Sequence, residues 1–432
     1  MSAGAVRALP RVGVLPEAQV TDGNPGRQDT ALPAGSALPE AAVPAGFAAV
    51  LRYFLRLGTL GFGGPIAVVG YMQRDLVTQR GWMAKQDFLN GVALGQTMPG
   101  PLAAQVAMWV GYLRRGALGA AATAAAFIIP SFVMVTAVAA LYVHYAGLPA
   151  VQSLFYGIAP AVMAIIAIAA YKLVRLTDGK DWRAWAVSAT VFAVTAVTGQ
   201  EPIYLIIGAG LLMILLDARP RLRMRQQSGP PAPGQDPTPR LAIAPFPLAL
   251  QALAVAASGG ALISLGLFFL KTGALVFGSG LAIVPLLRDG VVAQHHWLTQ
   301  GQFLDAVAMG LITPGPVVIT AAFIGYLVAG FPGALIATVA IFTPIWLGVV
   351  LPGRWFIRHR DNPQVKAFVT GATAAAGGAL SGAVVVLTRQ AVTDIPTAVI
   401  AIVALGLLLR FKISEPWVVA AAGTLGLLLH WP

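Results

Sequence analysis

The sequence has no cysteine among its 432 residues, which excludes disulfide bonds, thiolate metal ligands and cysteine nucleophiles. Charge is also scarce: Asp, Glu, Lys and Arg make up 10% of the chain, against roughly 25% in a typical soluble domain. Apolar residues make up 57%, the mean hydropathy is +0.78, and apolar runs recur at about the ~20 residues that cross a bilayer. The runs lack a period of two, which disfavours a membrane barrel. The sequence therefore predicts an all-α, polytopic membrane protein.

Acidic residues are fewer than basic ones, 16 against 28, for a net charge of +12. In a membrane protein this balance indicates Lys and Arg in cytoplasmic loops, so the lipid bilayer is an expected partner and nucleic acid is not. The chain has no Walker loop and no Ser–His–Asp arrangement. It also has no carboxylate cluster of the kind a metal-dependent intramembrane enzyme needs. We therefore expect no catalytic residue, no metal and no cofactor.

Composition divides the chain into four parts. Residues 1–44, rich in Pro, Gly and Ala, are expected to form a disordered cytoplasmic tail. Residues 45–216 form the first transmembrane repeat, and the basic, Pro-rich residues 217–246 form a cytoplasmic linker. Residues 247–432 form the second transmembrane repeat, with one extra helix.

The two apolar parts are copies of one another at an offset of 214 or 215 residues. Chance similarity between hydrophobic segments would not keep Pro, Gly and Trp in register over this length. The matched residues are Phe62 and Phe277, Trp82 and Trp297, Pro99-Gly100-Pro101 and Pro314-Gly315-Pro316, Gly111-Tyr112-Leu113 and Gly325-Tyr326-Leu327, Pro130 and Pro344, and Glu201-Pro202 and Glu415-Pro416.

Each copy is expected to contain six helical segments. In the first copy they are 46–71, 87–113, 117–143, 150–172, 184–199 and 202–216. In the second copy they are 262–287, 302–329, 332–352, 364–387, 395–409 and 416–430. An extra apolar stretch at 245–261 brings the total to ~13 spans and lets the second copy enter the membrane from the opposite side.

Loop charges favour this inversion. With the N-terminus in the cytoplasm, the loops that carry Arg114 and Lys180 are inside, as are those that carry Arg358 and Arg410 in the second copy. The second set has no basic counterpart in the first copy, as the positive-inside rule predicts for inverted repeats. The exceptions are Arg74, Arg80 and Lys85, which would lie outside.

Two Pro-Gly-Pro sequences interrupt apolar segments and are the strongest candidates for a binding site. They remove backbone donors, so each helix breaks and a second half-helix begins with unpaired amides at the positive end of its dipole. Such an end binds anions, although a plain kink is the alternative. The candidate substrate-binding residues here are Gln96, Pro99, Gly100, Pro101, Leu102, Gln105, Thr313, Pro314, Gly315, Pro316 and Val317.

A glycine motif and two cations complete the candidate site. Gly61-Phe62-Gly63-Gly64-Pro65 matches Phe277-Gly278-Ser279-Gly280, and Gly63, Gly64 and Gly278 are candidate contacts, although small residues also serve helix packing. Arg56 and its counterpart Lys271 lie within apolar segments and are candidates for balancing a dianion, with snorkelling as the alternative. Asp305, the counterpart of Asn90, is a candidate to carry a proton or to pair with Lys271.

The glycine motif at 61–65, the paired Pro-Gly-Pro sequences and the tandem halves resemble the long, two-domain form of the chromate ion transporter family, over about residues 46–430. The second copy departs from the first motif, because it lacks the proline. The resemblance implies a multi-pass protein of the bacterial inner membrane that exports chromate from the cytoplasm and confers resistance. The membrane potential or the proton motive force would drive export. Sulfate or another oxyanion is the alternative substrate, an anion channel or an enzyme acting on lipid phosphates is less favoured, and a homodimer is a further expectation.

The charge pattern predicts which sides of the membrane two equivalent positions face. Reporter fusions after residues 116 and 331 should report opposite sides, because an inverted second copy exchanges inside and outside. Alkaline phosphatase and green fluorescent protein fusions measure this directly. Signals from one side at both positions would contradict the inversion.

Overall fold

The computed structural model describes residues 45–62, 64–145, 148–199, 203–217, 259–277, 280–353, 362–411 and 413–430, and all regular structure in these ranges is helical. The expected tail at 1–44, nearly all of the linker at 217–246 and most of the extra stretch at 245–261 lie outside the described residues. The helices of the first half are α1 (Phe47–Leu60), α2 (Gly64–Met72), η1 (Gln73–Gln79), α3 (Lys85–Thr97), α4 (Leu102–Tyr145), α5 (Pro149–Asp178), α6 (Trp182–Thr198) and α7 (Ile203–Asp217).

The second half repeats this series. Its helices are α9 (Gly259–Ala274), η2 (Gly280–Ala282), α10 (Ile283–Arg288), η3 (Asp289–Gln294), α11 (Gln300–Ile312), η4 (Val317–Ile319), α12 (Thr320–Val350), α14 (Pro363–Ala391), α15 (Ile395–Phe411) and α16 (Glu415–Leu429). Among the described residues, four helices are long and apolar enough to cross a bilayer: α4, α5, α12 with η4, and α14. Shorter apolar helices are α7, α9, α15 and α16.

The first expected span, 46–71, does not cross the bundle once but forms a hairpin of α1 and α2. Arg114 donates one hydrogen bond to the carbonyl oxygen of Ala45 (2.8 Å) and another to that of Trp82 (2.5 Å), so the start of α1 and the loop after η1 lie at the same end of the bundle. We call this end the arginine end. With 14 residues, α1 is about 21 Å long, less than the ~30 Å of a bilayer core. The chain turns back after Gly61, and Gly64 takes the positive φ of +76° that this turn requires.

The second expected span, 87–113, also folds back, at its Pro-Gly-Pro. The indole of Trp109 donates to the carbonyl oxygen of Asp87 (2.9 Å), so α3 and the first part of α4 lie side by side in opposite directions. The loop with Arg80 and the start of α3 at Lys85 therefore join the arginine end. The charges that the sequence placed on the other side of the membrane thus lie with Arg114.

The second half contains the same two hairpins. The ring of Phe268 in α9 contacts His295 and Trp297 just after η3, with centroids 5.8 and 5.7 Å apart. In the next hairpin, Gly310 of α11 packs directly on the side chain of Thr320 in α12. Four segments expected to cross once are therefore hairpins, and the sequence-based total of ~13 spans counted each of them as a single crossing.

Both long helices that follow the breaks bend at the same place. In α4 the bend lies at Arg115 (φ −142°, ψ 28°) and Gly116 (φ 59°, ψ −147°). In α12 it lies at Ala329 (φ −146°, ψ 28°) and Gly330 (φ 62°, ψ −153°). Glycine supplies the positive φ in each case, so the internal repeat of the sequence recurs as a repeat of backbone geometry.

The long parts of α4 and α12 pack against each other in opposite directions. Residue numbers rise along α4 as they fall along α12 in three contacts: Trp346 Nε1 donates to Ala117 O at 3.2 Å, the rings of Phe132 and Phe331 are 6.1 Å apart, and those of Tyr142 and Phe323 are 5.4 Å apart. Equivalent helices of the two halves are thus antiparallel where they meet.

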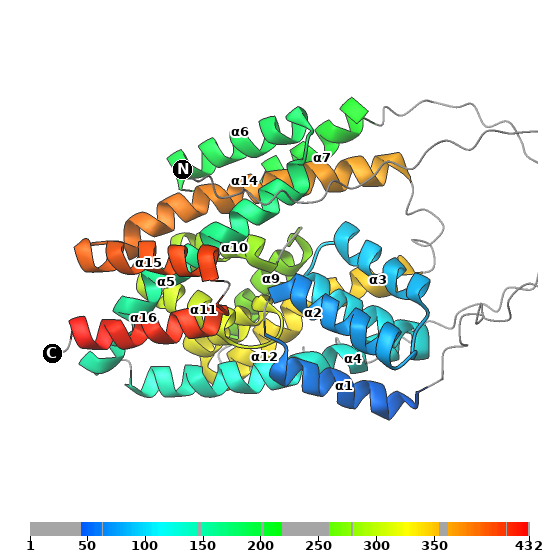
Figure 1. The fold of residues 1–432 in the computed structure, drawn as a ribbon, viewed down its shortest axis with the longest axis horizontal. Helices are drawn as coiled ribbons and strands as arrows, with labels where there is room; N and C mark the ends of the chain where they lie inside the picture. Colours follow the sequence, from blue (N-terminus) through cyan, green and yellow to red (C-terminus); the bar gives the residue numbers. More distant parts are fainter. Residues whose placement is uncertain are drawn as a thin grey trace, which may run out of the picture. The chain divides into compact units, whose positions relative to one another are not determined.

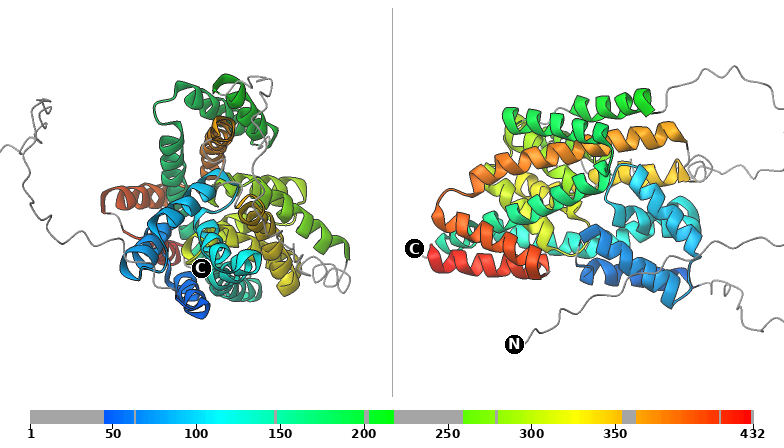
Figure 2. Two further views of the ribbon diagram at one scale, coloured as in Figure 1. Left: turned by 90° about the vertical axis from the view of Figure 1, so that its right-hand side faces the viewer. Right: turned by 45° about the horizontal axis from the view of Figure 1, so that its top comes forward.

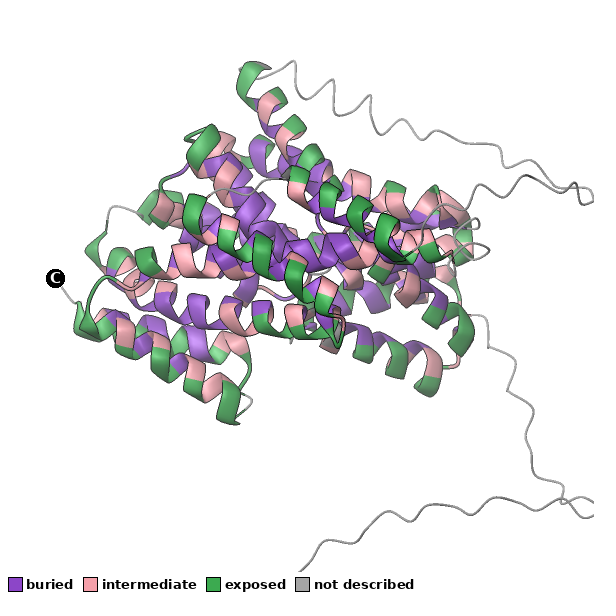
Figure 3. Cartoon of the chain, turned by 90° about the horizontal axis from the view of Figure 1, so that it is seen from above, coloured by how far each residue is buried: buried purple, intermediate pink, exposed green. Residues whose placement is uncertain are grey.

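Helices α5 and α14 each pack against helices of the opposite half. Helix α5 packs against α15 and α16, and α14 packs against α6 and α7; these helices lie near one another in Figures 1 and 2. Small residues permit the close approach: Gly157 lies against the backbone of Ala422 and Gly426, and Gly371 lies against Ala209. Viewed from above, buried positions follow the inner helices and exposed ones the outer helices (Figure 3).

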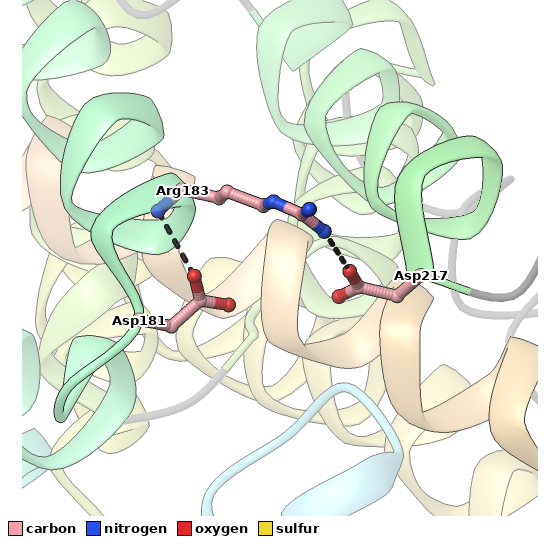
Figure 4. Close-up of polar contacts among 3 residues, drawn as sticks. All are labelled: Asp181, Arg183 and Asp217. Atoms are coloured by element: carbon pink, nitrogen blue, oxygen red, sulfur yellow. Dashed lines mark hydrogen bonds and ion pairs between the residues drawn. The ribbon is translucent and has the colours of Figure 1, made fainter.

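An ion pair closes the hairpin of α6 and α7 (Figure 4). Arg183 Nη1 lies 2.5 Å from Asp217 Oδ1, and the carboxylate of Asp181 caps α6 by accepting from the backbone amide of Arg183 at 2.9 Å. Both partners are more than one-third exposed, so the pair contributes little stability. The ion pair holds the start of α6 close to the end of α7, where the expected linker begins.

The packing of Gly157 predicts the cost of a single methyl group. Gly157→Ala forces a Cβ into the Ala422 carbonyl and should lower the free energy of unfolding by about 1–3 kcal/mol. Gly208→Ala, at a helical position with no atom within 4 Å, is the matched control and should be neutral or slightly stabilising. Thermal unfolding in detergent measures both variants. Equal midpoints would show that the α5–α16 contact is looser than described.

Candidate functional site

The tips of the hairpins meet inside the bundle. The backbone amide of Gly100 donates to the carbonyl oxygen of Val276 at 2.6 Å, which joins the first Pro-Gly-Pro to the glycine turn of the other half. A Cβ placed on Gly280 would lie 3.6 Å from Pro101 Cβ and 3.8 Å from Val317 Cβ. The two breaks and the turn after α9 are therefore within contact distance of one another.

Each break also rests on the long helix of the opposite half. Gly315 (φ +110°) lies directly against Ser131 of α4, whose hydroxyl donates to the carbonyl oxygen of Pro314 at 2.7 Å. Gly100 (φ +140°) lies in the same way against Ile345 of α12. A side chain at either glycine would meet both a strained backbone and an occupied space, which explains glycine between the prolines.

Carbonyl oxygens freed by the breaks find donors within the protein. The buried amide of Gln105 donates to Met98 O (3.2 Å) and Pro99 O (2.9 Å), so its donors hold the backbone and are not free for a ligand. Threonine hydroxyls add hydrogen bonds to carbonyl oxygens beside the breaks: Thr97 donates to Ala93 O at 2.7 Å, Thr313 to Met309 O at 2.6 Å and Thr320 to Val317 O at 2.8 Å. Of these, Met309 O and Val317 O also accept from a backbone amide. The negative ends of the helix dipoles are thereby compensated.

The positive ends are not compensated in the same way. Four return helices, α2, α4, α10 with η2, and α12 with η4, begin at the tips, and the first amides of a helix have no intrahelical partner. No side chain caps η4 at Pro316, and α12 continues from η4 through the Thr320 amide, which donates to the carbonyl oxygens of Val317 and Val318. With carbonyls paired and amides uncapped, the tips carry an excess of positive potential, which is the electrostatic condition for holding an anion.

The structure brings some predicted site residues together and separates others. Pro101, Gly280 and Val317 meet, and Gly100, Pro101, Pro314 and Pro316 are buried at the breaks. Leu102 and Gly315 are half-buried there, as are Pro99, Thr313 and Gly64. Gln96 is exposed, and Gly63 and Gly278 lie outside the described residues.

The two predicted cations lie on the outside of the bundle. Arg56 is exposed on α1 and, with Arg52, Arg80, Tyr53 and Trp82, lines a hollow of about 320 Å³. Lys271 is exposed on α9, one turn before that helix ends. Neither cation contacts the breaks in this conformation, although each stands one turn before the tip of its own hairpin.

Asp305 is buried and joins the two halves. It is 9% exposed, and its Oδ2 accepts a hydrogen bond from the hydroxyl of Tyr142 at 2.7 Å. Sequence reasoning missed Tyr142 as the partner and missed the role of Ser131. The available signal was weak in both cases: one polar side chain within an apolar run, directly after Pro130 for Ser131.

The fold and the site define a membrane-embedded α-helical protein whose broken helices converge from two homologous halves. The chain belongs to the chromate transporter family, whose model matches residues 48–214 and 263–427, one region in each half. Membership of this family makes the chain a transporter.

Two relatives match almost the whole chain. A protein named chromate transport protein from Cupriavidus metallidurans is 47% identical over 383 residues, 88% of this chain and 92% of that protein. A protein named probable chromate transport protein from Synechococcus elongatus is 46% identical over 379 residues, 87% of this chain and 94% of that protein. No solved structure matches the chain.

The contacts of Gln105 predict that it stabilises the first break. Gln105→Leu keeps the volume but leaves two carbonyl oxygens without donors, and should lower the free energy of unfolding by about 1–3 kcal/mol. Gln96→Leu, at an exposed position nine residues earlier, is the control and should change it little. Thermal unfolding in detergent compares them. A Gln105→Leu protein as stable as the control would mean that water replaces the amide.

Proposed function

We propose that the protein is a secondary transporter that exports chromate from the cytoplasm across the bacterial plasma membrane and so confers chromate resistance. Family membership and the printed names of the two relatives support chromate as substrate. The observation that carries the mechanism is the meeting of hairpin tips whose carbonyls are paired and whose helix amides are uncapped. A tetrahedral dianion fits such a cluster of positive dipole ends.

An inverted arrangement of the two halves fits the packing. A pseudo-two-fold axis in the membrane plane makes equivalent helices of the two halves antiparallel where they meet. The contacts between α4 and α12 are antiparallel in this way. The arginine end carries Arg80, Lys85 and Arg114, and the positive-inside rule assigns that end to the cytoplasm, together with the N-terminus at residue 45. The linker would then be cytoplasmic, and the stretch at 245–261 would return the chain to the opposite side.

Chromate would bind between the two breaks. The first amides of α4 after Pro101 and of η4 after Pro316 would donate to its oxygens, with Gly64 and the other tip glycines allowing close approach. Because Gly100 and Pro101 are buried, the halves must move apart for the ion to enter and leave. Arg56 and Lys271 would supply charge to the dianion as it reaches the tips.

The membrane potential is sufficient to drive export. Moving one charge outward across an interior-negative membrane releases about 2.3 kcal/mol per 100 mV, so a dianion gains about 4.6 kcal/mol. At about 1.4 kcal/mol per factor of ten, this supports a gradient of more than a thousandfold. Export therefore needs no ATP.

Everted membrane vesicles test the function. Wild-type vesicles should take up chromate when energised, and uptake should fall at least tenfold when the potential is collapsed, because the dianion carries two charges against the field. The assay compares labelled chromate with labelled sulfate in the same vesicles. Uptake of sulfate without chromate would contradict the substrate, and uptake that never saturates would indicate a channel.

Charge variants test the cations in the same assay. Arg56→Gln combined with Lys271→Gln should slow chromate uptake several-fold, because no charge then balances the dianion near the tips. Arg183→Gln, in the exposed ion pair of Figure 4, is the control and should keep the wild-type rate. A double variant as fast as the control would remove both cations from the transport path.

A further inference from the structure

The contact between Asp305 and Tyr142 is a polar bridge inside an apolar interface between the two halves. Asp305 belongs to α11 of the second half and Tyr142 to α4 of the first. The tyrosine ring is held by Phe155 and Phe323, each with centroids 5.4 Å away. An ionisable group in such a place is costly and marks function more often than packing.

Among the described residues, no cation interacts with the Asp305 carboxylate. The titratable and charged groups on the helices packed against α11 are Tyr112, Arg114, Arg115, Tyr142, His144 and Tyr145 of α4, Tyr156, Tyr171, Lys172, Arg175 and Asp178 of α5, Arg288 of α10, Asp289 of η3, Tyr326 of α12 and Glu415 of α16. Within the described part of the chain, Tyr142 is the one among them that interacts with the Asp305 carboxylate. Lys271, the sequence-based candidate partner, is exposed on α9. Asp305 therefore lies where gaining a proton removes an unbalanced charge.

The repeat makes this group unique to one half. The residue at the equivalent position of the first half is Asn90, whose amide oxygen accepts from Gln86 at 3.2 Å and cannot titrate. Lys85 and Asp87 of α3 also have uncharged counterparts in α11, but both are exposed, so Asp305 is the ionisable group by which the buried positions of α3 and α11 differ. A packing role would be served equally by an amide, as the first half demonstrates.

The bridge lies far from the arginine end. Ala117 starts the long part of α4 beside that end, and Tyr142 lies about 38 Å further along the helix, more than the ~30 Å of a bilayer core. In the topology proposed above, Asp305 is reached from the outside.

We propose that Asp305 is a proton-binding site that couples the entry of one proton to the export of one oxyanion, with Tyr142 as its positioning residue. This inference rests on the proposed transport function. The ionised carboxylate accepts the hydrogen bond from Tyr142 and holds the two halves together. A hydronium ion from outside then gives its proton to an Asp305 oxygen and leaves water, while Tyr142 keeps its own proton. The neutral pair separates, the halves move, and the proton leaves to the cytoplasm.

Purified protein in liposomes tests the coupling, with the membrane potential clamped at zero by a potassium ionophore. Both compartments are kept alkaline so that the substrate stays a dianion. With one proton exchanged per chromate, a gradient of one pH unit should sustain a chromate gradient of about tenfold. Asp305→Asn should sustain none, yet still exchange labelled for unlabelled chromate, because exchange needs the substrate site and not the proton.

Two further variants separate coupling from stability. Asp305→Glu keeps a titratable group and should restore a gradient close to tenfold, and Tyr142→Phe should give a smaller gradient because the bridge no longer holds the halves. The matched control is Asp394→Asn, which removes an exposed carboxylate that also accepts from a tyrosine, Tyr156, at 2.5 Å. It should keep the full tenfold gradient.

The outcomes are distinct. A pH-driven chromate gradient in Asp305→Asn as large as in the wild type overturns the assignment of Asp305. A wild type that moves chromate with the potential and ignores the pH gradient overturns the proton coupling but leaves the transport function intact. A wild type that neither accumulates nor exchanges chromate overturns both.

Discussion

The structure depends on one constraint: a backbone group freed by a helix break inside a bilayer must find its partner in the protein. The helix breaks of this chain meet that constraint partly within each half, as Gln105 does for Met98 and Pro99, and partly across the interface between the halves. The Ser131 hydroxyl of one half donates to the Pro314 carbonyl oxygen of the other, and the Gly100 amide donates to the Val276 carbonyl oxygen. Each half thus pairs backbone groups that the breaks of the other half leave free.

The way in which the constraint is met also sets the electrostatics of the centre. Hydroxyl and amide side chains donate and so pair with carbonyl oxygens, as Gln105 and Thr313 do here. Capping the amides would require acceptors such as carboxylates, and no described side chain caps the start of η4. Because the polar side chains around the prolines are hydrogen-bond donors, they leave the backbone amides at the helix N-termini unpaired. These amides carry the positive end of the helix dipole, so the breaks favour an anion over a cation.

Much of this arrangement could be predicted from the sequence, and the limits have physical causes. The repeat and the breaks were readable because proline and glycine act through the local backbone. The hairpins were not, because an apolar run of 26 residues such as 46–71 has the same hydropathy whether it crosses once or turns back at its glycines. Gln105 and Arg56 looked alike as candidate ligands. Only the packed structure shows that the Gln105 amide is hydrogen-bonded to the backbone, whereas the Arg56 guanidinium lies on the outer face of the bundle.

The two halves are nearly equivalent, yet one carries a titratable group at a position where the other carries an amide. A perfectly two-fold protein would present the same energies with its halves exchanged, so the gradients alone would distinguish the two directions of transport. The substitution of Asp305 for the amide of Asn90 breaks that equivalence at a contact which spans the interface. It does so while both Pro-Gly-Pro breaks keep a glycine with positive φ, +140° at Gly100 and +110° at Gly315. In the proposed mechanism, substrate binding depends on the breaks that the halves share, and proton coupling depends on Asp305, which only one half carries.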